Sequence, residues 1–199
     1  MALVFDRRSV NFFDGKKEIS NDKLKEIIDL ANTAPSAFNL QPWKIIAVKS
    51  EEAKKKLHPL AFNQDKVLEA PVTLIIVSDR EGYKSDKPIW TELAKMMGEG
   101  TEGAQQMSAN LYGTTEERKI KFAESNAGLL AMSIMYAAKH HGIDSHPMSG
   151  VDFDGLKKAY NLAENEDVVM LISLGYHDSS KEVWPKGFRK PFEELVEIL

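Results

Sequence analysis

The chain has 199 residues, of which 43% are hydrophobic and 28% are charged, and it contains no cysteine. Its net charge of −4 provides no overall positive field for nucleic acid, and the lack of thiols excludes disulfides and thiolate chemistry. Length and composition predict one globular domain over residues 1–199. Because no apolar run near the N-terminus is long enough for a signal peptide or a spanning helix, we expect a cytoplasmic protein without a membrane partner.

The first half of the chain alternates helical and strand patterns. A helix is predicted from Ser20 or Asn21 to about Ala34, because apolar residues recur at helical spacing and Pro35 then disfavours helical geometry. The next elements predicted are a short strand at 45–48, a charged helix at 51–57, a β-branched strand at 72–77 and a helix at 89–97.

The second half begins with a glycine-rich, polar stretch at 98–113, which is predicted to be a mobile excursion or lid. The longest helical pattern covers 116–141 and is apolar over much of its surface, so we expect it to lie centrally, against a second subunit. A third strand is predicted at 168–174, and an amphipathic tail at 191–199. Strands separated by more numerous helices predict an α+β domain with a central sheet flanked by helices.

Three motif-like patterns are better explained by structure than by function. The glycines of 98–103 have the letters of a dinucleotide-binding loop, but no strand precedes them and no βαβ unit follows. The lysines at 54–56 are expected to form a solvated surface. No metal site is predicted, because metal ligands usually share one helix face and three histidines near a helix end do not: His140, His141 and His146.

Cations and polar side chains gather at the ends of the predicted elements, with no matching acid and base. If these segments meet, they form a site for an anionic ligand with a hydrogen-bonding ring, because the fork of arginine suits phosphate and a lysine could stabilise a reduced, anionic ring. Taken singly, each cation is better explained as an ordinary surface charge. The residues concerned are Arg7, Arg8, Ser9, Asn63, Lys66, Pro147, Met148, Ser149, Gly150, Lys186 and Arg189.

The loop at 34–43 adds a hydroxyl, two carboxamides and an indole between two prolines. Together with Arg7-Arg8-Ser9-Val10 and Phe13, its Pro-Ser-x-x-Asn-x-Gln-Pro-Trp pattern resembles the FMN-dependent nitroreductase family. The resemblance continues in order through 62–66, 147–150, 174–176 and 189–191. It implies an α+β fold with a central, mostly antiparallel sheet, and a homodimer with two FMN sites at the subunit interface. The long helix would then form much of that interface.

The resemblance also implies roles for individual residues. Arg7 and Arg189 would hold the FMN phosphate, with Lys186 as a further contact, Arg8 would also bind the cofactor, and Ser9 would contact the ribityl chain or ring edge. Asn11 stands where many relatives carry Arg or Lys. The other expected cofactor contacts are Asn63 and Lys66 at the pyrimidine edge, Pro147, Met148, Ser149 and Gly150 under the flavin, and Pro35, Ser36, Ala37 and Asn39 from the partner subunit. Phe38 and Phe122 are expected to shape the acceptor pocket.

The reaction implied by the resemblance is transfer of a hydride from NAD(P)H, by way of flavin N5, to nitroaromatic, quinone or related acceptors. One site would serve both substrates, so ping-pong kinetics and no catalytic side chain are expected. Two alternatives stay open on the sequence. One is another FMN reductase on the same fold, such as a dehalogenase or enone reductase, and the other is a flavin-binding module without turnover.

Overall fold

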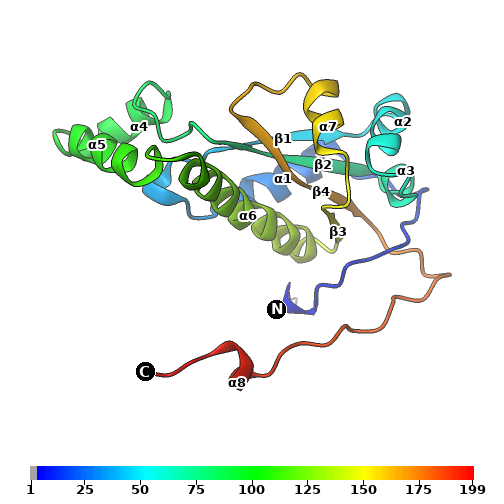
Figure 1. Cartoon of the computed structure of the whole chain (residues 1–199). Coiled ribbons are helices and arrows are strands. Elements are labelled where there is room, and N and C mark those ends of the chain that lie inside the picture. Colours follow the sequence, from blue (N-terminus) through cyan, green and yellow to red (C-terminus); the bar gives the residue numbers. More distant parts are fainter. Residues whose placement is uncertain (1–3) are drawn as a thin grey trace.

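The computed structural model describes residues 4–199, and its centre is an antiparallel sheet with the strand order β1-β2-β4-β3 (Figure 1). All three strand pairs are antiparallel. This arrangement confirms the predicted α+β class, with a central antiparallel sheet between helices. The strands are β1 (Trp43–Val48), β2 (Val72–Asp79), β3 (Asp144–Met148) and β4 (Glu166–Gly175).

Helices cover both faces of the sheet, and α4 and α5 project at one end (Figure 1). One face is covered by α1 and α6, and the other face is covered by α2, α3 and α7. The α-helices are α1 (Asn21–Ala31), α2 (Glu51–Leu60), α3 (Lys66–Glu69), α4 (Ile89–Met97), α5 (Gly100–Tyr112), α6 (Glu116–His140), α7 (Phe153–Ala159) and α8 (Phe192–Leu195), with 3₁₀ turns at η1 (Val4–Asp6) and η2 (Ala37–Asn39).

Strand β2 is apolar from Leu74 to Val77 because both of its faces are covered. Leu74 and Ile76 pack with α1 and α6, whereas Ile75 and Val77 pack with the helices of the other face. Successive side chains of a strand point to opposite faces, so a strand between two helical layers is a continuous apolar run rather than an alternating one. The strand predicted at 72–77 is confirmed, as are the strands at 45–48 and 168–174 and the helices at 89–97 and 116–141.

Two segments differ from the prediction. Residues 98–113 are not an irregular excursion, because most of them form α5, which buries Thr101, Ala104 and Ser108 at helical spacing. Small and polar residues carry that period, so hydropathy does not reveal it. β3 was missed because its sequence, Asp-Ser-His-Pro-Met, has the composition of a turn. A proline is tolerated there because β3 is an edge strand.

The lysines at 54–56 are only partly a solvated surface. Lys55 and Lys56 are exposed, but Lys54 is only 7% exposed and its Nζ donates to the carbonyl oxygen of Leu68 at 3.3 Å. Burial lowers the pKa of Lys54, although the nearby charges of Glu51 and Glu18 oppose the change. The prediction for Lys54 was wrong because a charge run does not reveal which of its members faces a neighbouring helix.

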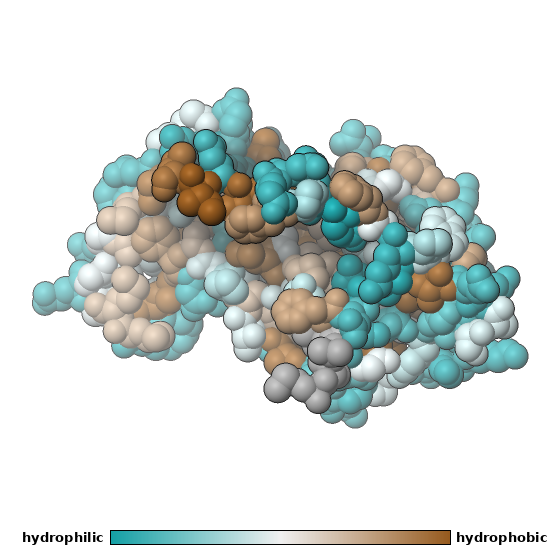
Figure 2. All heavy atoms as spheres, turned by 90° about the horizontal axis from the view of Figure 1, so that it is seen from below, coloured by the Kyte–Doolittle hydropathy of each residue, from teal (hydrophilic) through white to brown (hydrophobic). Residues whose placement is uncertain are grey.

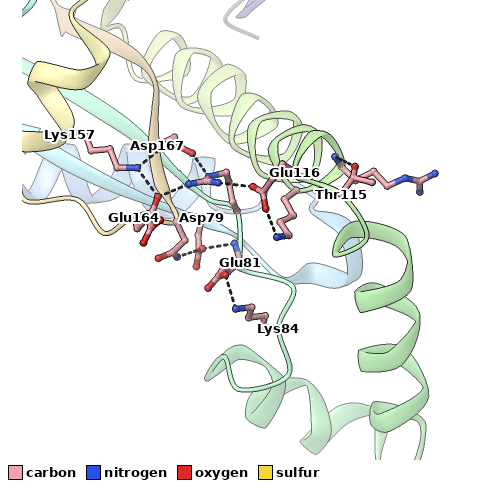
Figure 3. A network of polar contacts seen from close by, with 12 residues as sticks. Asp79, Glu81, Lys84, Thr115, Glu116, Lys157, Glu164 and Asp167 are labelled. Atoms are coloured by element: carbon pink, nitrogen blue, oxygen red, sulfur yellow. Dashed lines mark hydrogen bonds and ion pairs between the residues drawn. The ribbon is translucent and has the colours of Figure 1, made fainter.

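A polar network holds the start of α6 to the sheet (Figure 3). Arg80 follows β2, and its guanidinium donates to Glu116 Oε2 at 2.9 Å and to the carbonyl oxygen of Glu164 at 2.6 Å. Lys157 of α7 lies 3.0 Å from Asp167 of β4. These contacts fix the first turn of α6 relative to β2 and β4, and therefore fix the position of the residues that follow on α6.

After β4 the chain leaves the body of the molecule as an extended arm that carries the short helix α8 (Figure 1). We call residues 179–199 the C-terminal arm. Its side chains are almost all exposed, including large apolar ones: Trp184, Phe188, Phe192, Leu195 and Ile198. Only the short helix α8 is regular within the predicted amphipathic tail. Among residues 4–199, no helix is long and apolar enough to cross a membrane.

Candidate functional site

A pocket of about 410 Å³ lies between the N-terminal segment and the C-terminal arm. Its walls bring together residues from the two ends of the sequence, and we call it the arginine pocket. Six of the residues predicted to contact a cofactor line it, namely Arg7, Arg8, Ser9, Asn11, Lys186 and Arg189, together with Phe5, Asp6, His146, Trp184, Pro185 and Gly187.

Strand β3 positions the N-terminal side of this pocket. Ser9 forms an isolated parallel bridge with Ser145, and the N–H of Val10 donates to the Ser145 carbonyl at 3.2 Å. The ring of His146 bonds the Val10 carbonyl through Nδ1 at 2.9 Å. These contacts use the free edge of the sheet, so they hold the arginines at the end of β3.

Arg7 is the cation of this pocket that most needs a partner. Its Nη1 atom is buried and has no hydrogen-bond partner among residues 4–199. Burial lowers the pKa of Arg7, Tyr136 opposes the change, and the charge of Arg189 lowers the pKa further. A buried, unpaired guanidinium is unfavourable, and an anion with fork-compatible oxygens would satisfy it. The arginine pocket therefore fits a phosphate group.

The other two arginines are already engaged with the backbone. Arg8 Nη2 donates to the Trp184 carbonyl at 2.5 Å and so links the N-terminal segment to the C-terminal arm. Arg189 Nη1 donates to the carbonyls of Gly187 and Phe188 in its own loop, at 3.2 and 2.8 Å. Neither bond uses the whole guanidinium, so both groups keep donors for an anion.

A second polar cluster lies where the 62–66 segment meets the end of β3. Gln64 Nε2 donates to the Gly150 carbonyl at 3.0 Å, and Lys66 Nζ donates to Gln64 Oε1 at 3.3 Å. Asn63 has a left-handed backbone, with φ at 57°, and Ser149 is exposed. Burial lowers the pKa of Lys66, while Glu69 and Asp65 oppose the change.

This cluster and the arginine pocket both lie within electrostatic reach of His146, because the charges of Lys66 and Arg7 each lower the pKa of its imidazole. Gln64 and His146 were not predicted as site residues. The family-like segment around Gln64 could have indicated it, whereas His146 had no signal beyond its place near the Pro147 segment. Met148 is a correction: its side chain is only 4% exposed and packs in the core, so it can offer a ligand only its backbone.

The loop around η2 is held against the middle of α6. The N–H of Ala37 donates to Asn126 Oδ1 at 2.8 Å, and Asn126 Nδ2 donates to the Phe122 carbonyl at 2.6 Å. Phe38 and Asn39 have left-handed backbones, with φ at 52° and 56°. This conformation is costly for Phe38, where it persists only if the surroundings impose it, whereas Asn tolerates it.

Beside this loop lies a second pocket of about 410 Å³, which we call the aromatic pocket. Phe122 is buried and stacks on Tyr112 at 4.5 Å between ring centroids, and Phe38 lies edge-on to Tyr112 at 6.3 Å. Thus α5, predicted as a lid, supplies one of the aromatic walls. The pocket is lined by Ala37, Leu111, Tyr112, Arg118, Lys121, Phe122, Ser125 and Asn126.

Within one chain the two pockets are separate. The η2 loop meets the middle of α6 at Asn126. The N-terminal segment meets α6 near its C-terminal end, where Phe5 packs on Tyr136. The arginine pocket has no lining residue from the η2 loop, so Pro35, Ser36, Ala37 and Asn39 do not join the other predicted cofactor residues in the same chain.

His146 is expected to make stability depend on pH. Burial and Lys66 depress its pKa below 6.5, Val10 opposes this, and Arg7 adds to the depression. The unfolded chain then binds the proton more readily than the folded chain. The contribution of His146 to the free energy of unfolding is therefore fully present above the pKa of the unfolded chain, and it is lost as pH drops through the lower pKa of the folded chain. His146→Gln should reduce the loss of unfolding free energy between about pH 7.5 and about pH 5, as measured by urea denaturation.

The matched control for this experiment is His140→Gln, because His140 is exposed on α6 and lines neither pocket. It should retain the pH dependence of the unmodified chain. If His146→Gln retains the same dependence as well, the buried imidazole does not cause it.

Comparison with known proteins gives a consistent family. The sequence model of the nitroreductase family matches residues 4–176 of this chain. MhqN from Bacillus subtilis, named as a candidate NAD(P)H nitroreductase, is 33% identical over 99% of this chain and 97% of its own. The CLA biosynthesis enone reductase of Lactiplantibacillus plantarum is 30% identical over 87% and 83%. A structure from Exiguobacterium sibiricum, solved in complex with FMN, covers 98% and 95% with 26% identity and a TM-score of 0.84.

Proposed function

The chain belongs to the nitroreductase family, and from that premise we propose that it is a homodimeric enzyme that reduces nitroaromatic, quinone or related electrophilic acceptors. It is an NAD(P)H-dependent oxidoreductase with FMN as its cofactor, in line with its relatives. The observation that carries the proposal is the arginine pocket, where the buried Nη1 of Arg7 has no partner within residues 4–199.

In this proposal the arginine pocket holds the FMN phosphate through Arg7, Arg189 and Lys186. Bound FMN supplies the hydride chemistry between NAD(P)H and an acceptor, which no side chain can supply. The ammonium of Lys66, already partly desolvated, stabilises negative charge on the ring, because a cation acts more strongly where water is excluded. Asn63 and the backbone N–H groups of Ser149 and Gly150 donate hydrogen bonds to ring atoms.

The two substrates are proposed to use one site in turn. Among residues 4–199, no acid–base pair lines the arginine pocket, because the carboxylate there belongs to Asp6 and the imidazole of His146 is engaged with Val10. The side chains therefore bind and orient rather than transfer protons. Donor and acceptor would occupy the same space in succession, so we expect ping-pong kinetics. Asn11 brings no charge to the pocket, where relatives with Arg or Lys would have a cation.

A homodimer would explain three features together. The C-terminal arm has unburied apolar side chains, and α6 exposes Leu129 beside the half-buried Met132 and Tyr136. The face seen in Figure 2 carries several brown hydrophobic patches. The η2 loop lies apart from the arginine pocket of its own chain. Packing α6 against its copy would cover the apolar stripe and bring the partner's loop to the cofactor.

A second candidate function is the reduction of an enone, an electron-poor carbon–carbon double bond. The support is the enone reductase of Lactiplantibacillus plantarum, at 30% identity over 87% of this chain. The same cofactor site would serve this reaction. No feature of residues 4–199 gives comparable support to the other two alternatives, a dehalogenase and a flavin-binding module without turnover.

The first test is the visible absorption spectrum of the purified protein. We expect a flavin band that bleaches on anaerobic addition of NADH or NADPH and returns when a quinone or nitroaromatic compound is added. The faster nucleotide identifies the preferred donor. A band that does not bleach with either nucleotide would favour a flavin-binding module, and return of the band only with an enone would favour the second candidate.

A further inference from the structure

The aromatic pocket contains two cations that the proposed function does not use. Arg118 and Lys121 lie on the first turns of α6, both exposed, at one side of the stacked rings of Tyr112 and Phe122. Arg118 donates to the carbonyl oxygen of Leu111 at 3.2 Å and has no carboxylate within ion-pair distance in the described chain. Lys121 has neither a hydrogen bond nor an ion pair within residues 4–199.

Among the lysines and arginines of α6, these two are the ones without an acidic partner in the described structure, because Lys119 and Lys139 are both paired. Glu117 and Glu124 are one helical turn from Lys121, at spacings that often form ion pairs, yet neither pairs with it in the described structure. On the same helix, Lys119 pairs with Glu116, which also accepts from Arg80. Glu116 therefore serves the network of Figure 3, and neither pocket cation has an ion pair within residues 4–199.

The side chains of Asn126 and Ser125 in the pocket are already used within the protein, whereas the hydroxyl of Tyr112 has no hydrogen bond within residues 4–199. Asn126 accepts from the N–H of Ala37 and donates to Phe122, and the hydroxyl of Ser125 donates to the same carbonyl at 3.3 Å. The walls otherwise consist of aromatic and aliphatic surface. A ligand would therefore find flat apolar walls and, at one side, two cations that can recognise only negative charge or acceptor atoms.

We propose that Arg118 and Lys121 bind an anionic group of the redox substrate whose flat, conjugated part lies against the aromatic wall formed by Tyr112 and Phe122. The chemistry is a carboxylate or phosphate, carried either by the acceptor or by the nucleotide donor. The proposal rests on the proposed function, in which the η2 loop beside this pocket lies at the partner's cofactor. It goes further because it gives the site a preference for charged substrates.

Equilibrium binding tests this without turnover. The FMN-loaded protein is titrated by calorimetry with 2-naphthoate and with its neutral match, 2-naphthamide. Arg118→Met and Lys121→Met should each weaken naphthoate binding by about 10-fold, and should change naphthamide binding less than about 2-fold. Lys158→Met is the matched control, because it removes the same charge from an exposed lysine of α7, on the other side of the sheet. It should bind both ligands normally.

Two kinetic arms identify the source of the anion. If Arg118→Met and Lys121→Met lose turnover with 4-nitrobenzoate but not with 4-nitrobenzamide, the cations bind the acceptor. If the two variants instead lose the preference between NADPH and NADH in flavin reduction, the cations bind the nucleotide. Equal effects on charged and neutral ligands, or none, would overturn the proposal. Turnover of 4-nitrobenzamide by the unmodified enzyme tests the proposed function separately, so the two can fail independently.

Discussion

Replacing Arg7 by methionine is expected to yield a protein that no longer retains FMN during purification. Arg7 is the one cation of the arginine pocket whose buried nitrogen lacks a partner in residues 4–199, so most of the gain from binding a phosphate should arise there. Methionine preserves the packing of the stem and removes the charge. We expect the dissociation constant of FMN, measured by fluorescence quenching, to rise by about 100-fold.

The same measurement on Arg189→Met separates a specific contact from general charge. Arg189 also lines the pocket, but it is exposed and its Nη1 is shared with two carbonyls of its own loop, so a smaller increase in the dissociation constant is expected. Lys158→Met serves as the distant control and should bind FMN normally. Retention of FMN by Arg7→Met at the affinity of the unmodified chain would exclude Arg7 from the cofactor site.

Replacing Leu129 by arginine is expected to convert the homodimer to a monomer. Leu129 is 46% exposed on α6, on the side turned away from the sheet, and the long helix is proposed to pack there against its copy. Two arginines facing each other across a two-fold interface would bury unpaired charge, which costs several kcal/mol. Light scattering after size exclusion should give the mass of one chain.

The matched control for this substitution is Phe153→Arg. Phe153 is 43% exposed on α7, which covers the opposite face of the sheet from α6, so its replacement should leave a dimer. The monomer should also lose FMN, because the partner's η2 loop is proposed to complete the site. Arg7→Met should lose FMN and stay dimeric. A dimeric Leu129→Arg protein would contradict an interface built on α6.

Much of the fold could be predicted because its periodic segments are long. In α6, buried apolar residues repeat at helical spacing from Phe122 to Ala138, and in β2 a β-branched run is covered on both faces. Such patterns indicate their own structure, since burial of one stripe or of two faces requires them. α5 was not predicted because its buried positions are small and polar: Thr101, Ala104 and Ser108.

The sequence predicted which residues belong to the candidate site, but not how those residues are arranged in it. The cations and the η2 loop stand out in the sequence, but their distribution does not say which of them meet. Arg7 is half-buried with an unpartnered Nη1 atom, whereas Arg8 is engaged with Trp184, and this difference depends on where the C-terminal arm crosses the N-terminal segment. No local pattern encodes a contact between the two ends of the chain.

By itself, then, the sequence determined the α+β class, the core strands and long helix, and the family-like motifs, because each depends on neighbours along the chain. Tertiary structure alone decided that β3 is a strand holding Ser9 and Val10, that Lys54 is buried, and that the η2 loop lies away from the arginine pocket. These features depend on pairings between distant segments, which are set by packing of the whole molecule rather than by local propensity.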